Sequence, residues 1–112
     1  MHTDIQARGF TLTEALQGAA DNAAKHYAEQ FPTLQISLQV RLFDINGLRG
    51  GVDKGCLVSA RIGHNRKVIV ANQMDSDLYR AIPAAFAKLT RATRSALNRE
   101  RTWQRTSFAQ AY

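Results

Sequence analysis

The sequence predicts an α+β domain with the element order β-α-β-β-β-α, in which a four-stranded sheet carries two helices packed on one face. Three observations support this class. Alternating apolar residues mark short strands, two longer segments carry apolar residues at helical spacing, and glycine or proline separates several of these segments. The 112 residues suffice for one modest core, so we expect one domain over residues 1–102 and a short tail over residues 103–112.

A strand and a helix are predicted in the first third of the chain. Residues 3–8 alternate between apolar or small and polar side chains, which is typical of a short, half-buried strand. Thr11 and Glu14 then have the spacing of a capping box, in which the hydroxyl and the carboxylate satisfy backbone amides at the start of a helix. We therefore expect a helix over about residues 12–31, which Pro32 ends.

Three strands are predicted in the middle of the chain. Residues 34–42 place an apolar side chain at every second position, so one side of this strand faces the core and the other faces water. Residues 44–55 contain four glycines and predict a loop. Residues 56–62 and 67–73 predict two further strands, joined by a hairpin turn. Because one side of the first of these strands is polar, both helices should cover only the other face of a mainly antiparallel sheet.

The last predicted element is a long helix. It should begin near residues 75–77, where Asp-Ser-Asp supplies capping side chains and negative charge for a helix N-terminus, and run to about Arg101. Pro83 lies beyond the first turn and should kink this helix, because proline lacks the amide hydrogen that the helical bond requires. A start of the helix nearer Ile82 is the alternative.

The composition predicts a protein that binds a polyanion and is not an enzyme. Lys and Arg number 15 against 9 Asp and Glu, which gives a formal net charge of +6. This surplus favours nucleic acid first and an anionic membrane surface second. Cys56 is the only cysteine, and the sequence holds no catalytic constellation or metal-ligand spacing, so we expect no cofactor and no metal. We also expect a cytoplasmic protein, because a signal peptide and a membrane span are absent from the sequence pattern.

On a helical wheel the last helix separates into an apolar stripe and a basic face. With about 100° per residue, the apolar side chains occupy one arc and the cations occupy the opposite arc. The cations of this arc are Arg80, Lys88, Arg91, Arg94, Arg99, Arg101 and Arg105. Between Ala84 and Arg105 the only acid is Glu100, whereas a solvated helix face usually alternates both signs. Because guanidinium groups match phosphate geometry with paired donors, this face predicts binding of a nucleic-acid backbone.

Four motifs of the sequence occur in the order found in a known family. The segment Thr13–Leu16 opens the first helix, Asp77–Ile82 opens the second, and Lys88-Leu89-x-Arg91 follows within it. Residues 44–56 look like a glycine-rich insert found in one proteobacterial branch of that family. Together with the element order, these motifs resemble the short form of the ribosome hibernation-promoting factor/RaiA family, which includes the sigma-54 modulation proteins, over about residues 3–101.

The resemblance implies a translation inhibitor that binds the decoding region of the small ribosomal subunit and its rRNA while the ribosome is stored. Basic positions of the family's second helix match Lys88, Arg91 and Arg99, and a basic position of its first helix matches His26. With neighbours on the same predicted surfaces, the expected RNA-binding residues are Lys25, His26, Arg80, Lys88, Arg91, Arg94 and Arg99. We expect no membrane partner, no small-molecule substrate and a monomer when the protein is free.

Several alternatives stay open at this point. Arg49 and Lys54 in the glycine-rich loop are candidates for secondary RNA contacts, although a structural role of the loop is favoured. The aromatic residues of the tail could stack on bases, although a disordered end or packing on the domain is favoured. The function could instead be binding of structured RNA outside the ribosome, on a fold similar to double-stranded RNA-binding domains. A third alternative is a protein-interaction module that regulates transcription.

Overall fold

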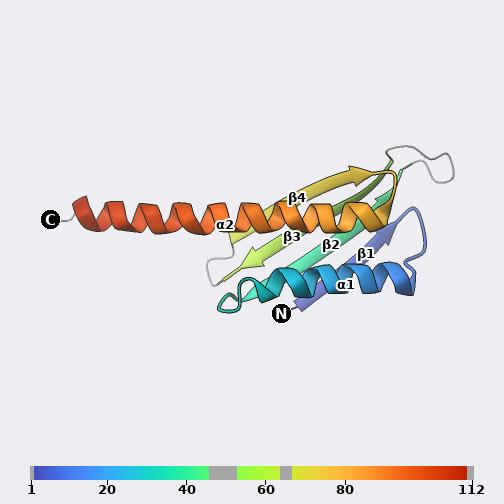
Figure 1. Ribbon diagram of the computed structural model, residues 1–112, viewed down its shortest axis with the longest axis horizontal. Helices are drawn as coiled ribbons and strands as arrows, with labels where there is room; N and C mark the ends of the chain where they lie inside the picture. The colour runs from blue at the N-terminus through green and yellow to red at the C-terminus, as the bar shows by residue number, and fades with distance from the viewer. Residues whose placement is uncertain (1, 46–52, 64–66, 111–112) are drawn as a thin grey trace.

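The described residues of the chain form six elements in the predicted order (Figure 1). The computed structural model describes the backbone of residues 2–45, 53–63 and 67–110, and the side chains of these ranges up to residue 99. The elements are β1 (His2–Arg8), α1 (Glu14–Glu29), β2 (Ile36–Asp44), β3 (Lys54–Ile62), β4 (Lys67–Asp75) and α2 (Leu78–Gln110). All four strands form close to their expected bounds, so the predicted fold class is confirmed.

The four strands form one mixed sheet in the order β1-β2-β3-β4. Strand β1 pairs in parallel with β2, because α1 connects them as a crossover, whereas β2 with β3 and β3 with β4 are antiparallel. The alternate residues of β2 that face the helices are buried: Ile36, Leu38, Val40 and Leu42. The residues between them are half-buried or exposed. Both helices cover the same face of the sheet (Figure 1), as this alternation predicts.

Helix α1 begins later than the sequence predicts. Thr13, not Thr11, is the N-cap, and its hydroxyl accepts a hydrogen bond from the backbone amide of Leu16 at 3.2 Å. The predicted capping box that starts at Thr11 is therefore wrong. Phe10 and Leu12 pack against the core, and Thr13 itself is extended, with φ −86° and ψ 158°. The tertiary packing of these apolar side chains keeps the segment outside the helix until Thr13, so the later threonine becomes the cap.

Helix α2 begins at Leu78, close to the predicted start. Asp77 caps it, since its carboxylate accepts a hydrogen bond from the backbone amide of Tyr79 at 2.9 Å. Pro83 lies inside the helix and does not interrupt it. The alternative start near Ile82 is therefore wrong.

The backbone of α2 continues beyond the expected end near Arg101, as far as Gln110. The helix therefore projects past the sheet (Figure 1). The backbone of residues 103–110, which the sequence assigns to a tail, is helical. The side chains of Trp103 and Phe108 lie outside the described residues, and the division of the chain at residue 102 stays a prediction.

A hydrogen bond between two buried hydroxyl groups joins α1 to α2 inside the core. The phenol oxygen of Tyr27 lies 2.8 Å from Thr93 Oγ1, and the two residues are 1% and 0% exposed. The Thr93 hydroxyl donates to the carbonyl of Leu89 at 2.8 Å, so Tyr27 is the donor in the bond between the helices. Burial raises the pKa of Tyr27, and the hydrogen bond to Thr93 opposes part of this rise. This contact holds the two helices in register above the sheet.

Candidate nucleic-acid interface

The outer side of α2 carries a face of one charge sign. Lys88, Arg91, Arg94 and Arg99, which we call the basic face, are all exposed. The sequence of α2 contains no Asp or Glu from Leu78 to Arg99. Among the residues that the structure describes, none of the four makes an ion pair. Their charges are therefore not balanced by described carboxylates, and the face suits an incoming anion.

Two hydrogen bonds fix side chains at the two edges of the basic face. Lys88 Nζ donates to the backbone carbonyl of Asn72 on β4 at 3.2 Å, and Arg94 Nη2 donates to Gln30 Oε1 beside α1 at 2.6 Å. The guanidinium carbon of Arg94 also lies 6.0 Å from the centre of the Phe31 ring. The basic face thus extends across the width of α2, from β4 on one side to α1 on the other. Each of these two cations keeps further N–H donors for a phosphate.

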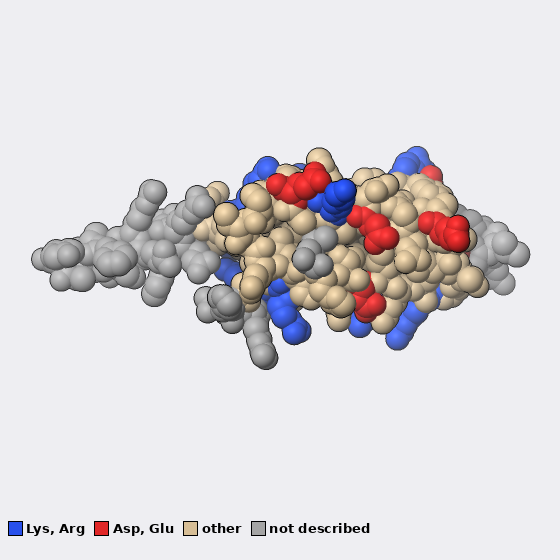
Figure 2. Space-filling view, turned by 90° about the horizontal axis from the view of Figure 1, so that it is seen from below, with Lys and Arg blue, Asp and Glu red and all other residues tan. Residues whose placement is uncertain are grey.

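Helix α1 contributes less positive charge. Lys25 and His26 are both exposed, and His26 lines a hollow between the helices together with Arg91. The edge of the molecule where α1 and β1 lie carries basic and acidic side chains interspersed (Figure 2). The acids of α1 are Glu14, Asp21 and Glu29. The structure therefore brings His26 next to the basic face, whereas the outer side of α1 has mixed charge.

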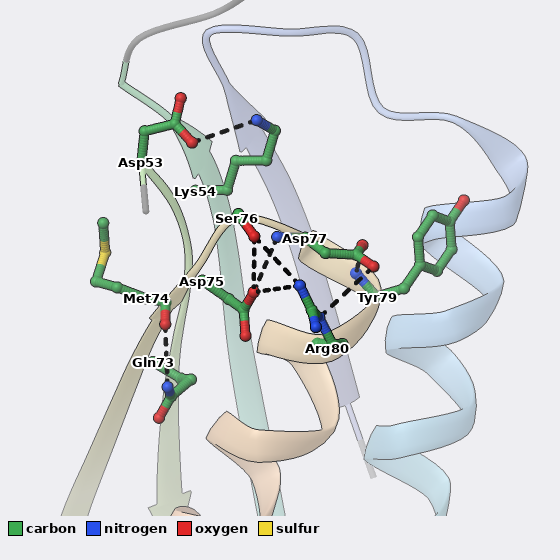
Figure 3. A network of polar contacts seen from close by, with 9 residues as sticks. All are labelled: Asp53, Lys54, Gln73, Met74, Asp75, Ser76, Asp77, Tyr79 and Arg80. Carbon is green, nitrogen blue, oxygen red and sulfur yellow. Dashed lines mark hydrogen bonds and ion pairs between the residues drawn. The ribbon is translucent and has the colours of Figure 1, made fainter. Parts of the chain in front are cut away.

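Arg80 lies on the same helix but in a different electrostatic environment (Figure 3). Its guanidinium nitrogens lie 3.3 Å from Asp75 Oδ1 and 3.9 Å from Asp77 Oδ2. Nη2 also donates to Ser76 Oγ at 3.2 Å. The residues that cap α2 therefore balance this charge, although the side chain is 67% exposed. The wheel groups Arg80 with the other cations, but the structure separates it from the basic face.

Lys54, at the end of the glycine-rich loop, likewise forms ion pairs with carboxylates of the protein itself (Figure 3). Its Nζ lies 3.3 Å from Asp53 Oδ1, the contact drawn in Figure 3. It also lies 3.8 Å from Asp44 Oδ2, and the Lys54 side chain is 23% exposed. Asp53 is buried, and its Oδ2 has no hydrogen-bond partner among the residues that the structure describes. Lys54 therefore compensates a buried carboxylate, which favours a structural role for this residue. Arg49, the other candidate of the loop, lies outside the described residues.

The described part of the chain contains no grouping of three or more His, Cys, Asp or Glu side chains that is suited to a metal ion. Cys56 is fully buried on β3, and burial raises its pKa to about 12. Its thiol therefore stays protonated near neutral pH, where a thiolate nucleophile would be required for covalent chemistry. No helix in the described ranges combines the length and the apolar character that a membrane crossing requires.

The sequence did not indicate the contacts that connect the two helices at this interface. Gln30 and Arg94 are 64 positions apart, and the sequence gives no local signal for their hydrogen bond. The hollow beside His26 likewise depends on how α1 and α2 pack. In contrast, the ion pairs of Arg80 could have been predicted from the sequence, because Asp75 and Asp77 lie only five and three positions away.

Comparisons with known proteins agree with this fold. The model of a family described as "Sigma 54 modulation protein / S30EA ribosomal protein" matches residues 3–101. A crystal structure of the N-terminal domain of Protein Y from Thermus thermophilus superposes with a TM-score of 0.65 at 15% identity, covering 80% of this chain and 92% of that domain. A ribosomal subunit interface protein from Coxiella burnetii superposes with a TM-score of 0.62 at 17% identity, covering 87% of this chain and 99% of that one. No curated protein sequence matches the chain.

Proposed function

Because the chain belongs to the Sigma 54 modulation protein / S30EA ribosomal protein family, we propose that it inhibits translation by binding the decoding region of the small ribosomal subunit. Membership of this family indicates that the protein associates with the ribosome and takes part in ribosome hibernation. In our proposal the protein acts by occupancy. It fills the space that messenger RNA and tRNA anticodons require, and it carries out no chemical reaction.

The basic face of α2 is the observation that carries this proposal. Four exposed cations follow one side of a helix from which acids are absent between Leu78 and Arg99. A helix that is only solvated gains stability from pairs of opposite charge, whereas neighbouring cations repel one another until an anion binds. Ribosomal RNA presents such anions as a dense array of phosphates. Lys88 and Arg94 are also held in place by neutral partners, so binding would require little additional ordering of these side chains.

The size of the face sets the expected strength of the electrostatic contribution. Four residues of α2, together with Lys25 and His26 of α1, would allow about four to six phosphate contacts. For that number, log affinity should fall with log salt concentration at a slope of roughly −3 to −5. Arg80, Arg49 and Lys54 should add less. The charges of Arg80 and Lys54 are balanced by Asp75, Asp77, Asp53 and Asp44.

The Coxiella burnetii protein with this fold is a ribosomal subunit interface protein, which supports a location on the small subunit that faces the large one. In our proposal residues 1–102 form the ribosome-binding domain, and the protein is a cytoplasmic monomer before it binds. Messenger RNA and tRNA pass through the decoding region, so a bound protein there would prevent initiation without altering the ribosome.

Sedimentation of a stationary-phase lysate through a sucrose gradient tests the proposal against its alternatives. Migration of the protein with ribosomal particles, released by high salt, is the expected result. Migration in light fractions that RNase treatment shifts would instead indicate a non-ribosomal structured RNA as the partner. A complex that RNase leaves intact would indicate a protein-interaction module. Either of the last two results contradicts the proposal.

A further inference from the structure

A hollow of about 380 Å³ opens between α1 and α2, next to the basic face. Its described lining residues belong to the two helices, apart from Gln30, which is the C-cap of α1. Tyr27 and Phe86 form the floor of the hollow, with ring centres 6.2 Å apart and an angle of 57° between the rings. Both residues are buried, at 1% and 4% exposure, so only parts of these side chains line the hollow. Small side chains at Ala23 and Ala87 leave the space above them open.

The rim of this hollow is polar and carries positive charge but no carboxylate among its described residues. His26 and Gln30 lie on the α1 side, and Arg91 lies on the α2 side. Gln30 Oε1 already accepts a hydrogen bond from Arg94, and Gln30 Nε2 lies 3.5 Å from the His26 carbonyl. One amide hydrogen of Gln30 is therefore available to a ligand. An apolar floor with a few convergent polar groups at the rim is the usual construction of a binding site for a small molecule.

We propose, on the basis of the function proposed above, that this hollow receives one unstacked base of an unpaired RNA segment, whose neighbouring phosphates bind His26 and Arg91. The base contacts the apolar floor, and Gln30 donates a hydrogen bond to its edge. The basic face contacts phosphates, and the hollow adds a contact with the base itself.

Charge complementarity selects single-stranded RNA as the occupant. An apolar side chain of a protein would also fill the floor, but it would bring no anion to His26 and Arg91. Paired RNA offers phosphates, but its bases are stacked and its deep groove is narrow, so no base can leave the helix without unpairing. An unpaired nucleotide combines a flat, largely apolar base with a phosphate on each side, which matches the floor and the rim together.

The groove continues past Gln30, which supports a strand rather than a single free nucleotide. A second hollow of about 270 Å³ lies beyond it; Gln30 lines both hollows, and Arg94 lines the second. Gln30, which the two hollows share, accepts a hydrogen bond from Arg94. A strand that leaves the first hollow near Arg91 would therefore meet Arg94 next along α2.

A comparison of three RNA ligands at one salt concentration tests this proposal. The ligands are a single strand of about ten adenosines, the same strand with its central bases removed, and a duplex of the same length. The intact protein should bind the complete strand about tenfold more tightly than the strand without bases, the effect expected of one base contact. The duplex should bind less tightly per phosphate than the complete strand, because its bases are paired and stacked.

The variant Ala87→Phe fills the hollow and should abolish the preference for bases, while affinity for the strand without bases stays unchanged. Ala87 is exposed, so the larger side chain does not have to enter the core. Ala15→Phe is the matched control, because Ala15 is an exposed alanine of α1 that lies outside the lining of the hollow. This control should keep the preference.

Equal affinity of the intact protein for strands with and without bases would overturn the proposal, and this result requires no variant to fold. A preference that persists in Ala87→Phe would also overturn it. Loss of ribosome binding in Ala87→Phe without any preference for bases would identify a protein side chain as the occupant, again against the proposal. Co-sedimentation of the intact protein with ribosomes, measured in parallel, reports separately on the proposed function.

Discussion

Replacing Thr93 by valine removes the hydroxyl that joins the two helices and leaves the phenol of Tyr27 buried without a partner. Valine has nearly the shape of threonine, so no cavity accompanies the change. The oxygen atoms lie 2.8 Å apart, and both residues are buried. An unpaired buried donor costs about 1–3 kcal/mol, so the free energy of unfolding should fall by that amount.

Tyr27→Phe should cost less than Thr93→Val. It removes the donor itself, while the Thr93 hydroxyl keeps its hydrogen bond to the Leu89 carbonyl at 2.8 Å. The loss is then the net value of one hydrogen bond, about 0.5–1.5 kcal/mol. The double variant also lacks this bond but contains no unpaired phenol. Its loss should therefore be smaller than the sum of the two single losses by about 1–3 kcal/mol.

Urea denaturation followed by far-ultraviolet circular dichroism measures these three free energies. The slope of the free energy against urea concentration should be the same for all variants, because the surface exposed on unfolding does not change. Losses that add to within about 0.3–0.5 kcal/mol would refute the reasoning, since additivity indicates that the two side chains do not interact.

Three further predictions follow from burial and from local charge. Leu89 is fully buried, so Leu89→Ala should lower the free energy of unfolding by about 2–5 kcal/mol in the same assay, and a loss below about 1 kcal/mol would place it outside the core. Burial raises the pKa of Cys56 from 9.0 to about 12, so the folded state keeps a proton that the unfolded state releases. The stability of the unsubstituted protein should therefore fall as pH rises from 9 to 12, by up to about 1.4 kcal/mol per pH unit relative to Cys56→Ala, and parallel pH profiles would contradict this. Arg80→Ala should weaken binding to purified small subunits less than Arg91→Ala does, because two carboxylates lie beside Arg80; equal losses would assign Arg80 to the interface.

The fold followed from the sequence where one local pattern determined the structure. Residues 34–42 alternate so regularly that only a strand with one covered face accommodates them, and β2 has that arrangement. The predicted cap of α1 was wrong because no local pattern determined it. Thr11 and Thr13 both precede the helix, and the choice between them depends on how Phe10 and Leu12 pack, which is tertiary information.

The basic face also followed from the sequence, because a helical wheel needs only the period of the helix. The wheel could not separate Arg80 from Arg91, since it includes charges on α2 but not the acids just before it. The contact of Arg94 with Gln30 and the hollow between the helices depend on the distance between α1 and α2. That distance is set by buried contacts such as the one between Tyr27 and Thr93, to which no single segment of sequence points.

The salt dependence of binding to purified small ribosomal subunits tests the central proposal most directly. The unsubstituted protein is compared with a variant in which the four residues of the basic face, Lys88, Arg91, Arg94 and Arg99, are replaced by alanine. All four are exposed, so the variant should melt at nearly the same temperature, apart from the loss of the Arg94 contact with Gln30.

The unsubstituted protein should show a slope of log affinity against log salt of roughly −3 to −5, and each lost phosphate contact should reduce its magnitude by about one. The folded variant should then fail to co-sediment with small subunits at physiological salt and should no longer inhibit translation in an extract. Binding of the variant at that salt with an unchanged slope would show that the ribosome-binding site lies elsewhere on the protein.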